Sequence, residues 1–595
     1  MHSVPPMLGM DLKRMTSAQR WTIIGAIIGV VVGFSTVIFY YSLQFATSFF
    51  MGDVVGYAQP LPLGEGGTPT YTFSISHYML LPLVIIIGAL VSGIIVYKFA
   101  PETAGHGTDA VIRAFHNEDG AVRLRASVVK LVSASLLIGS GGSGGREGPT
   151  AQFAAGIGHA ISKRLNISKS DKRTITAIAL GAGIGAIFRA PFGGALLAGE
   201  ILYKHDMEVE AIAPAVIASI IGFAIFGAFV GYTPIFGTGS GVSGFTFGAY
   251  NLLFFALVGV FTGLFARLYI KVFYHVHGFF SGLRVHNAFK PAIGAVVTGM
   301  VALAFPEVVG VGYGWIQLII TSGFQSFVGT YGMPLALFFV ILALAKMLVT
   351  STSIGSGGSG GVFAPGMFIG CSVGASIALT LGALFPASVP PYMVGAMAVI
   401  GMLSFFGAAG KVSIAVTIMV VEMTGSLALL PAGMIAIALA RLVSGEDSIY
   451  RSQVNTRRDS PAHIGEFYTP LMRRVKVRDV MRRGEIAIRP GTPIYRAEYV
   501  IKANSLASAP VVTSSGRLIG AAYIEDMVAL GEAAKRADVS SVARRVRHVD
   551  INDATSKAWV AMVKNRASWC AVLDGGRFVG VVRMRSIFRK YSGSD

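Results

Sequence analysis

One short glycine-rich run occurs twice in the chain, each time between two apolar segments. Residues 138–145 read Ile-Gly-Ser-Gly-Gly-Ser-Gly-Gly, and residues 354–361 repeat them at an offset of 216 (354 minus 138). A proline follows each run closely, at Pro149 and at Pro365. Proline favours the first turn of a helix, and glycine permits sharp backbone turns. Each run therefore predicts a helix that ends and restarts.

A restarted helix exposes free N–H donors and the positive end of its dipole. Two such ends facing one gap inside a membrane would bind an anion, as broken helices do in transporters with repeated halves. A loop that binds nucleotide phosphates would end in Gly-Lys-Ser/Thr, whereas Arg146-Glu147 and Val362-Phe363 stand here. Close helix packing through small residues explains some glycines but not the doubled run, so we favour the anion site.

Composition places both runs in a membrane protein. The 595 residues are 53% hydrophobic and 13% charged, with a mean hydropathy of +0.64. Apolar spans such as 21–50 and 412–442 exceed the ~20 residues that cross a bilayer, whereas 128–138 is too short to cross alone. Non-helical backbone at that depth must be buried or line a polar cavity. The pattern predicts an all-α polytopic membrane protein of spanning and broken helices.

The formal net charge of +19 is concentrated at the two ends of the apolar region. Lys13, Arg14 and Arg20 precede the first span, and a basic run from 451 to 483 follows the last. The positive-inside tendency predicts that both termini are cytoplasmic. Attraction to anionic lipid explains such a run more simply than nucleic-acid binding, so we expect a lipid bilayer and no nucleic acid as partner.

A second pair of similar segments indicates that the duplication is long. Glu200 lies nine residues after Pro191, and Glu422 lies nine residues after Ser413, which predicts two related halves. Hydropathy falls after the last span, and the tail reads as two β-β-α units in tandem. The predicted parts are a cytoplasmic N-terminal segment (1–20), a transmembrane domain (21–455, with halves of about 21–250 and 251–455), a basic linker (456–474) and a cytoplasmic paired domain (475–595).

Several motifs in order resemble the CLC family of chloride channels and proton/chloride exchangers. They are Gly-Arg-Glu-Gly-Pro at 145–149, Gly-Val-Phe-Ala-Pro at 361–365, Ala-Pro-Glu…Gly-x-Gly at 100–107, and Tyr450. The resemblance covers roughly residues 10–455, and the tail resembles a pair of CBS domains. It implies a multi-pass protein of the plasma membrane, with inverted halves. It also implies a homodimer with a separate anion pathway in each subunit.

The resemblance assigns Glu147 as the gating glutamate, which takes the anion's place and then moves or accepts a proton. A helix-capping glutamate, or one paired with Arg146, is the alternative. An acidic side chain inside the membrane is costly, which favours the functional role. The resemblance also implies that backbone N–H groups of Val362 and Phe363 hold a central anion, and that the Tyr450 hydroxyl donates to it.

The resemblance places an outer backbone cradle at Gly145, Arg146 and Gly148. For Tyr450, an interfacial aromatic anchor is the alternative to anion binding. In the first turn, His106 stands where the family usually has serine. An imidazole could donate to the anion, or bind it when protonated. Alternatively, His106 bonds neighbouring backbone while Thr108 or bare amides face the anion.

Exchangers of the family commonly carry a second, inward glutamate, and Ile201 stands at that position, ten residues after Pro191. Because isoleucine carries no proton, the sequence favours a channel for chloride or a similar monovalent anion. A proton-coupled antiporter that uses water, Glu200 or His106 as inner relay is the alternative. Glu200 has a structural alternative as well, an i,i+4 pair with Lys204.

No cofactor is required by this interpretation. The tail pair retains the carboxylate that often contacts an adenine nucleotide at Asp526, but Ser586 stands at the matching place in the second unit. Structural dimerisation is therefore an equally good role for the pair. A membrane-anchored nucleotide sensor or enzyme is a remote alternative, since the sequence offers no nucleophile–base set or metal cluster.

Overall fold

The computed structural model divides into two compact units, Met1–Ala462 and His463–Asp595, which are described separately. It describes residues 15–165, 167–237, 242, 248, 251–323, 333–463, 472, 475–484, 486–504, 506–530, 537–565 and 567–592. Most of the predicted N-terminal segment 1–20, including Lys13 and Arg14, lies outside these residues. So does much of the predicted basic linker 456–474.

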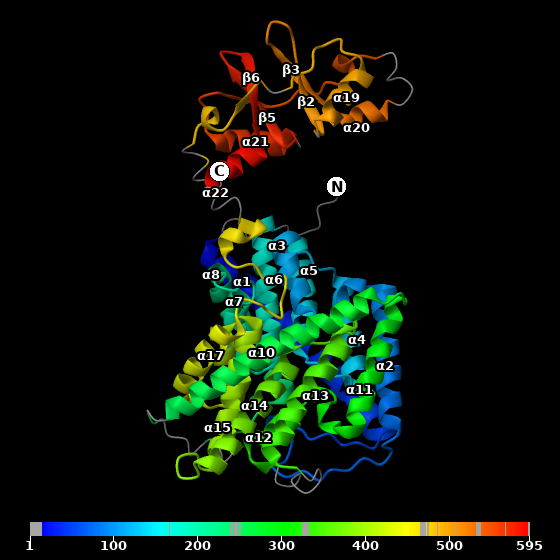
Figure 1. Cartoon of the computed structure of the whole chain (residues 1–595), viewed down its shortest axis with the longest axis vertical. Coiled ribbons are helices and arrows are strands. Elements are labelled where there is room, and N and C mark those ends of the chain that lie inside the picture. Colours follow the sequence, from blue (N-terminus) through cyan, green and yellow to red (C-terminus); the bar gives the residue numbers. More distant parts are fainter. Residues whose placement is uncertain are drawn as a thin grey trace. The chain divides into compact units, whose positions relative to one another are not determined.

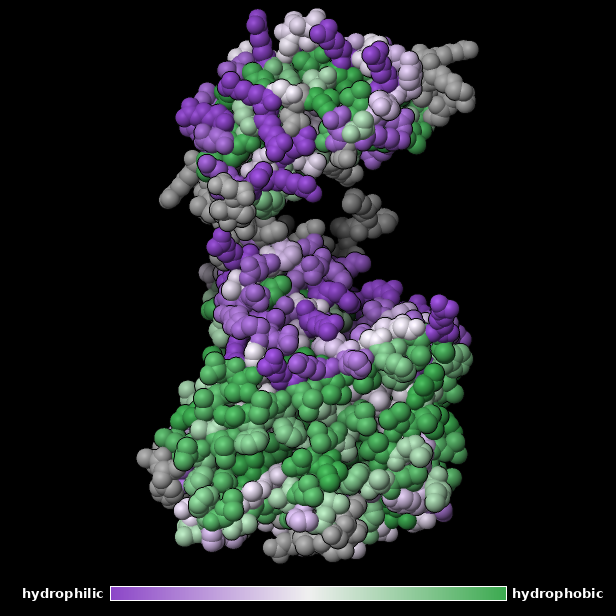
Figure 2. Space-filling view, viewed as in Figure 1, coloured by the Kyte–Doolittle hydropathy of each residue, from purple (hydrophilic) through white to green (hydrophobic). Residues whose placement is uncertain are grey.

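The first unit is a bundle of helices. Within the described residues, nine helices are long and apolar enough to cross a membrane. Figure 2 shows hydrophobic side chains in a broad band across the visible face of this unit, as expected of a surface that faces lipid. These helices are α1 (Ser17–Thr47, continued by π-helical η1, Ser48–Val54), α2 (Leu80–Phe99), α8 (Val209–Val230), α10 (Asn251–Gly282), α11 (Lys290–Ala304), α13 (Leu335–Gly355), α14 (Phe363–Leu384), α15 (Met393–Gly410) and α17 (Leu430–Ser444).

Shorter helices lie among them (Figure 1). They are α3 (Thr108–Asn117), α4 (Leu124–Gly139), α5 (Glu147–Arg164), α6 (Lys169–Ile187), α7 (Pro191–Glu200), α12 (Tyr313–Ile320) and α16 (Ser413–Thr424). Both glycine-rich runs interrupt the helical path, between α4 and α5 and between α13 and α14. The predicted all-α membrane fold of spanning and broken helices is confirmed.

The unit has two faces, which we name by what they carry. The terminal face carries the start of α1 and the segment after α17. There Arg20 forms an ion pair with Asp171 at 3.4 Å, and the Lys204 N–H donates to the Val454 carbonyl at 2.9 Å. The loop face carries the connections α1–α2, α8–α10 and α11–α13.

The two glycine-rich runs meet at the centre of this unit. The N–H of Gly145 donates to the Gly361 carbonyl at 2.8 Å, and the N–H of Gly361 donates to the Gly145 carbonyl at 2.7 Å. Gly141 and Gly357 occupy matching positions in the runs and both have positive φ, 97° and 103°. This reciprocal pairing is what a two-fold relation between inverted halves produces.

A second repeated turn supports the same relation, although only its first copy was predicted as a motif. Residues 100–107 read Ala-Pro-Glu-Thr-Ala-Gly-His-Gly, and residues 305–312 read Phe-Pro-Glu-Val-Val-Gly-Val-Gly. Each forms a 3-10 turn, η3 (Pro101–Thr103) or η5 (Pro306–Val308), and leads into a short helix, α3 or α12.

A buried lysine holds each of these turns. Lys130 donates to the carbonyl of Thr103 at 2.9 Å and to that of Gly105 at 2.7 Å. Lys346, also at an offset of 216, donates to the carbonyls of Val308 and Gly310 at 2.7 and 2.9 Å. A buried ammonium group needs such acceptors to offset its desolvation.

Two glutamates cap helices reciprocally across the halves. Glu200, the last residue of α7, accepts from the N–H groups of Ile414 and Ala415 at 3.0 and 2.7 Å. Glu422, in the last turn of α16, accepts from Phe192 and Gly193 at 3.1 and 2.7 Å. A carboxylate at a helix N-terminus satisfies free donors and the helix dipole. Both oxygens of Glu200 thus bind the start of α16, which differs from the expected pairing with Lys204.

The second unit contains two copies of one β-β-α arrangement, each preceded by a helix. The first copy is α19 (Ile494–Ala503), β2 (Ser508–Val512), β3 (Leu518–Tyr523) and α20 (Ile524–Ala529). The second is β4 (His548–Asp550), α21 (Thr555–Asn565), β5 (Trp569–Asp574), β6 (Arg577–Arg583) and α22 (Met584–Ser592).

Strand pairing and packing join the two copies of this unit. β2 pairs with β3, and a second sheet has the order β1-β6-β5-β4, so that β1 (Arg482–Arg483) lies against β6. Tyr523 from the first copy and Trp569 from the second share one buried cluster, and the Trp569 indole donates to the Ser508 hydroxyl at 2.9 Å.

Candidate functional site

The candidate site lies where α5 and α14 begin, beside the paired glycine-rich runs. Glu147 is the first residue of α5, and its side chain is only 2% exposed. Its Oε1 accepts the backbone N–H of Phe363, the first residue of α14, at 2.5 Å. The carboxylate therefore satisfies a free donor at the start of the opposite broken helix.

Glycine is required on both sides of this carboxylate. A Cβ atom at Gly145 would lie 2.0 Å from Glu147 Oε2, and one at Gly361 would lie 2.0 Å from Oε1. Among the described residues, Oε2 has no hydrogen-bond partner. The Glu147 side chain thus fills a slot that is walled by both runs, where free backbone donors would otherwise face an anion.

Val362 and Phe363, whose backbone N–H groups were predicted to hold the central anion, form one wall of this slot. Val362 and Phe363 are 1% and 2% exposed. The Phe363 ring packs against Phe406 and Phe188, with ring centroids 4.3 and 5.2 Å apart. Their side chains are therefore apolar wall, and the polar contribution of this segment is its backbone.

Tyr450 lies on the other side of a small cavity from the glycine-rich runs. The Tyr450 side chain is 2% exposed, and its ring packs against that of Phe406, with ring centroids 6.3 Å apart. The cavity, about 10 Å³, is lined by Thr108, Glu147, Ile184, Phe188, Leu197, Ile201, Phe363, Phe406 and Tyr450. Residues from six separate parts of the sequence thus converge, and Glu147 is the only carboxylate among these lining residues.

His106 lies near this cavity but is not among its lining residues. Its ring packs beside those of Tyr450 and Phe273, with centroids 5.5 and 6.0 Å apart. Its carbonyl touches α5, since a Cβ atom at Gly148 would lie 1.9 Å from that oxygen. Among the described residues its Nδ1 has no hydrogen-bond partner. Thr108, rather than the imidazole, faces the cavity from this turn.

Arg146 forms its ion pair with Glu65, which was not among the predicted site residues. Its Nη2 donates to Glu65 Oε1 at 2.6 Å, and the two side chains are only 4% and 9% exposed. Glu65 ends the 3-10 turn η2 (Leu63–Glu65) in the α1–α2 connection. In the sequence Glu65 is an isolated acidic residue in a polar loop, and nothing in that pattern identifies Arg146 as its partner.

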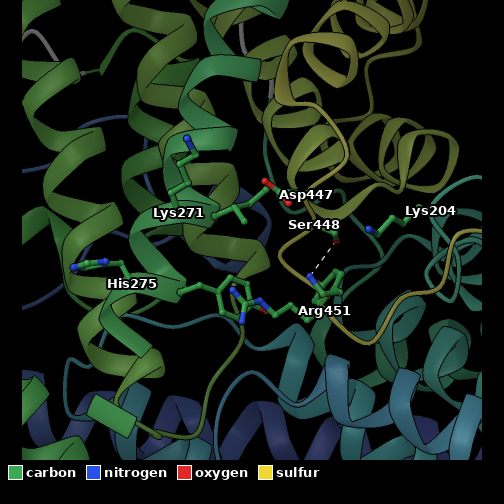
Figure 3. Close-up of a pocket in the computed structure, with 9 residues that line it drawn as sticks. Lys204, Lys271, His275, Asp447, Ser448 and Arg451 are labelled. Carbon is green, nitrogen blue, oxygen red and sulfur yellow. Dashed lines mark hydrogen bonds between the residues drawn. The ribbon is translucent and has the colours of Figure 1, made fainter. Parts of the chain in front are cut away.

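A pocket of about 490 Å³ opens beside Tyr450 on the terminal face. Figure 3 shows that its labelled side chains come from α10, from the segment after α17 and from the segment after α7. They are Lys204, Lys271, His275, Asp447, Ser448 and Arg451. Tyr450 also lines this pocket, so the tyrosine separates it from the small cavity. The excess of basic groups attracts anions toward that point.

In the second unit, Asp526 lies in α20 and accepts a hydrogen bond from Arg544. This bond raises the pKa of the Arg544 guanidinium. The other oxygen, Oδ2, has no partner among the described residues. Ser586 lies in α22 at the matching position. Within the part of the chain that the structure describes, no cluster of three or more metal-ligating side chains occurs.

Comparison with known families gives two matches. Residues 88–445 match the family described as voltage gated chloride channel, and residues 477–531 match the CBS domain. The first match covers more than half of the chain and includes every residue of the slot around Glu147.

Two curated relatives are similar over most of their own length. An uncharacterized protein of Methanocaldococcus jannaschii, MJ0305, is 30% identical over 318 residues, which is 53% of this chain and 74% of the relative. The voltage-gated ClC-type chloride channel ClcB of Shigella flexneri is 29% identical over 336 residues, 56% of this chain and 77% of the relative.

Solved structures share the fold. A slow cyanobacterial Cl⁻/H⁺ antiporter aligns with a TM-score of 0.60 and 20% identity, over 72% of this chain and 96% of its own. A eukaryotic CLC transporter aligns with a TM-score of 0.59 and 17% identity, over 96% of this chain and 98% of its own.

Proposed function

The chain belongs to the CLC family of voltage gated chloride channels and related transporters, and it carries a C-terminal CBS pair. From this premise we propose that the protein passes chloride or a similar monovalent anion, with Glu147 as the gate. The hydrogen bond between Glu147 Oε1 and the Phe363 N–H carries this proposal. A carboxylate is itself an anion, and it sits on a donor suited to one. An anion can therefore pass only when the Glu147 side chain leaves the slot or becomes neutral by accepting a proton.

Electrostatics supports this role for Glu147. Two negative charges in one narrow, water-poor slot repel strongly, so a permeating anion and an ionised Glu147 exclude each other. A neutral side chain lifts that exclusion. Glu147→Gln and Glu147→Ala are expected to raise passive chloride flux into reconstituted vesicles and to remove its dependence on pH.

Glu118→Gln provides a matched control, since Glu118 is an exposed glutamate on the terminal side of α3 that pairs with Arg113. Its flux should equal that of the unmodified protein. If Glu147→Ala leaves both the rate and the pH profile of flux unchanged, Glu147 is not the gate.

We favour a channel mode over proton-coupled exchange. Ile201 lines the cavity below Glu147, and both oxygens of Glu200 are occupied by backbone N–H groups. Neither side chain is then suited to relay a proton from the terminal face. Chloride flux down its gradient should proceed without proton movement, as a pH electrode outside the vesicles would record.

Proton-coupled exchange is the second candidate, and the unpartnered Nδ1 of His106 beside Tyr450 favours it. In that case a proton gradient should drive chloride uphill, and His106→Phe should abolish this coupling while passive flux persists. A membrane-bound enzyme or nucleotide sensor would instead give nucleotide turnover without any anion flux.

We further propose that the terminal face is cytoplasmic in the plasma membrane. The chain has no lysine or arginine in residues 48–79, 231–250, 305–334, 385–392 and 425–429, which form or adjoin the loop face. Basic residues concentrate at 163–173 and 451–458, on or near the terminal face. This asymmetry follows the positive-inside tendency. Labelling of single cysteines introduced at Asp53 and at Lys163 in intact cells tests it.

Two further assignments belong to this proposal. The protein forms a homodimer in which each subunit has its own pathway, since Glu147, Phe363 and Tyr450 come from one chain. The mass of the protein in detergent, which should be that of two chains, tests the homodimer.

The CBS pair takes an adenine nucleotide through Asp526, whose Oδ2 has no partner among the described residues. A rise in the melting temperature of the full chain with ATP or AMP, lost in Asp526→Asn, would support that ligand.

A further inference from the structure

A second cavity, of about 340 Å³, opens on the loop face, above the arginine that precedes the gate. Its walls are rich in aromatic rings and contain a few polar groups. The rings belong to Tyr40, Tyr57, Tyr313 and Trp315, and the polar lining includes Asp53, Gln59, Glu65 and Arg146. The cavity is much larger than a halide requires, and its size and apolar walls are typical of a small-molecule site.

The α1–α2 connection that forms one wall is held firmly in place. The Tyr57 hydroxyl donates to the Pro306 carbonyl at 3.2 Å, and the Gly64 N–H donates to the Ile235 carbonyl at 3.0 Å. A Cβ atom at Gly314 would lie 1.8 Å from the Pro60 carbonyl oxygen, so this loop packs directly on the start of α12. The cavity is therefore preformed.

Two buried donors of this cavity lack a protein acceptor. Among the described residues, Nε of Arg146 and Nε2 of Gln59 have no hydrogen-bond partner. Arg146 is 4% exposed, and its guanidinium lies over the Tyr313 ring at 4.9 Å. An unsatisfied buried donor is costly, and these two require an acceptor that enters the cavity.

The charged side chains that line this cavity are Arg146, Glu65 and the exposed Asp53, so the buried donors, and not the net charge, favour an anionic acceptor. Arg146 is balanced by Glu65, which engages only Nη2. The carboxylate of Glu65 is itself a negatively charged group bound to the arginine, much as Glu147 is bound to the start of α14. An external carboxylate could take the remaining edge of the guanidinium, since arginine recognises carboxylates through paired N–H donors.

We propose that this loop-face cavity is a binding site for a small organic acid. Its carboxylate accepts from Arg146 Nε and Gln59 Nε2, and its apolar body packs on the surrounding rings. Arg146 immediately precedes Glu147, so an occupant that fixes the arginine slows movement of the gate and reduces anion flux. The binding itself goes beyond the transport function and does not depend on it.

The test uses benzoate as the probe on the purified full-length protein. Binding is read from the shift in melting temperature with benzoate concentration, at constant chloride. Gln59→Leu removes one hydrogen bond to a charged group and should weaken benzoate roughly tenfold. Glu65→Gln frees Arg146 and should tighten benzoate by about fivefold or more.

Asp53→Asn is the matched control, because Asp53 lines the same cavity but is exposed, and removal of its screened charge should change benzoate affinity by less than about twofold. Inhibition of chloride flux by benzoate added on the loop-face side gives an independent readout. Equal affinities in the unmodified, Gln59→Leu and Glu65→Gln proteins would overturn the proposal, as would no benzoate binding at tens of millimolar. Full competition by chloride at equal concentration would indicate an inorganic anion site and also overturn it.

Discussion

The turns at residues 100–107 and 305–312 share one frame but have different surroundings. Lys130 and Lys346 hold them in the same way, and each leads into a short helix. The first turn, with α3, faces Tyr450 and the small cavity. The second, with α12, is covered by the α1–α2 connection and lines the loop-face cavity.

The two halves share the same turns, buried lysines and helix starts, and these shared parts are structural. The halves differ in only a few side chains, and those are the ones to which we assign function. At the restarted helices, Arg146-Glu147 in one half corresponds to Val362-Phe363 in the other. One half therefore supplies the buried carboxylate that we propose as the gate, and the other supplies the apolar wall and the backbone donor. These four residues differ in charge between the halves, while glycines, lysines and capping glutamates preserve the duplicate geometry.

Lys130→Met and Lys346→Met should give the largest effect on stability. Each removes the donor from two buried carbonyls, which should cost about 2–5 kcal/mol of unfolding free energy. If the frame is symmetric, both variants lose similar stability in thermal unfolding in detergent. A loss in only one variant would show that the two turns are not equivalent supports.

The capping glutamates come next. Glu200→Gln and Glu422→Gln each turn one acceptor oxygen into a donor that faces a backbone N–H, with an expected loss of roughly 1–3 kcal/mol. The loss should be larger for Glu200, which is 6% exposed, than for Glu422, which is partly exposed. Thermal unfolding of the single and double variants measures this, and an unaltered melting temperature for Glu200→Gln would contradict the capping role.

His106→Ser should change function with little effect on stability. Because an imidazole can change its charge, the pH profile of anion flux in His106→Ser should differ from that of the unmodified protein if the ring acts on the pathway. Val311→Ser, the same change at the matching position of the other turn, is the control and should retain the pH profile. An unchanged pH profile of flux in His106→Ser would indicate that Thr108, and not His106, is the side chain of this turn that contacts the anion.

The smallest effect is expected outside the duplicated frame, at Glu446 and His205, which form an exposed pair at 2.7 Å. The hydrogen bond from His205 lowers the pKa of Glu446. Stabilisation by a carboxylate with a lowered pKa is present above its unfolded pKa and is lost as pH falls through the folded pKa. Since surface pairs contribute little, Glu446→Gln should cost less than about 0.5 kcal/mol at pH 7 and nothing at pH 3. A cost that grows toward pH 3 would contradict this assignment.

Much of the fold was predictable because glycine, proline and hydropathy act locally. The repeated runs at 138–145 and 354–361 predicted the broken helices, and these runs lie together. The second turn at 305–312 was missed although its Pro-Glu…Gly-x-Gly pattern is present. Its central residue is Val311 in place of His106, so that only the frame residues match.

Long-range pairings were not predictable from one sequence. The partner of Arg146 proved to be Glu65, and Glu200 proved to bind the start of α16. These contacts join segments far apart in the chain, and no local periodicity encodes them. The positions of Glu147 and Tyr450 near one cavity followed from family resemblance rather than from spacing.

The mutual hydrogen bonds between Gly145 and Gly361 join the two halves directly beside the Glu147 carboxylate. Movement of one half against the other would break these two hydrogen bonds, whereas rotation of the Glu147 side chain leaves them intact. Ion passage should then displace very little protein volume. Hydrostatic pressure and lipid chain length should therefore have only a slight influence on the turnover rate, in contrast to carriers that swing whole domains.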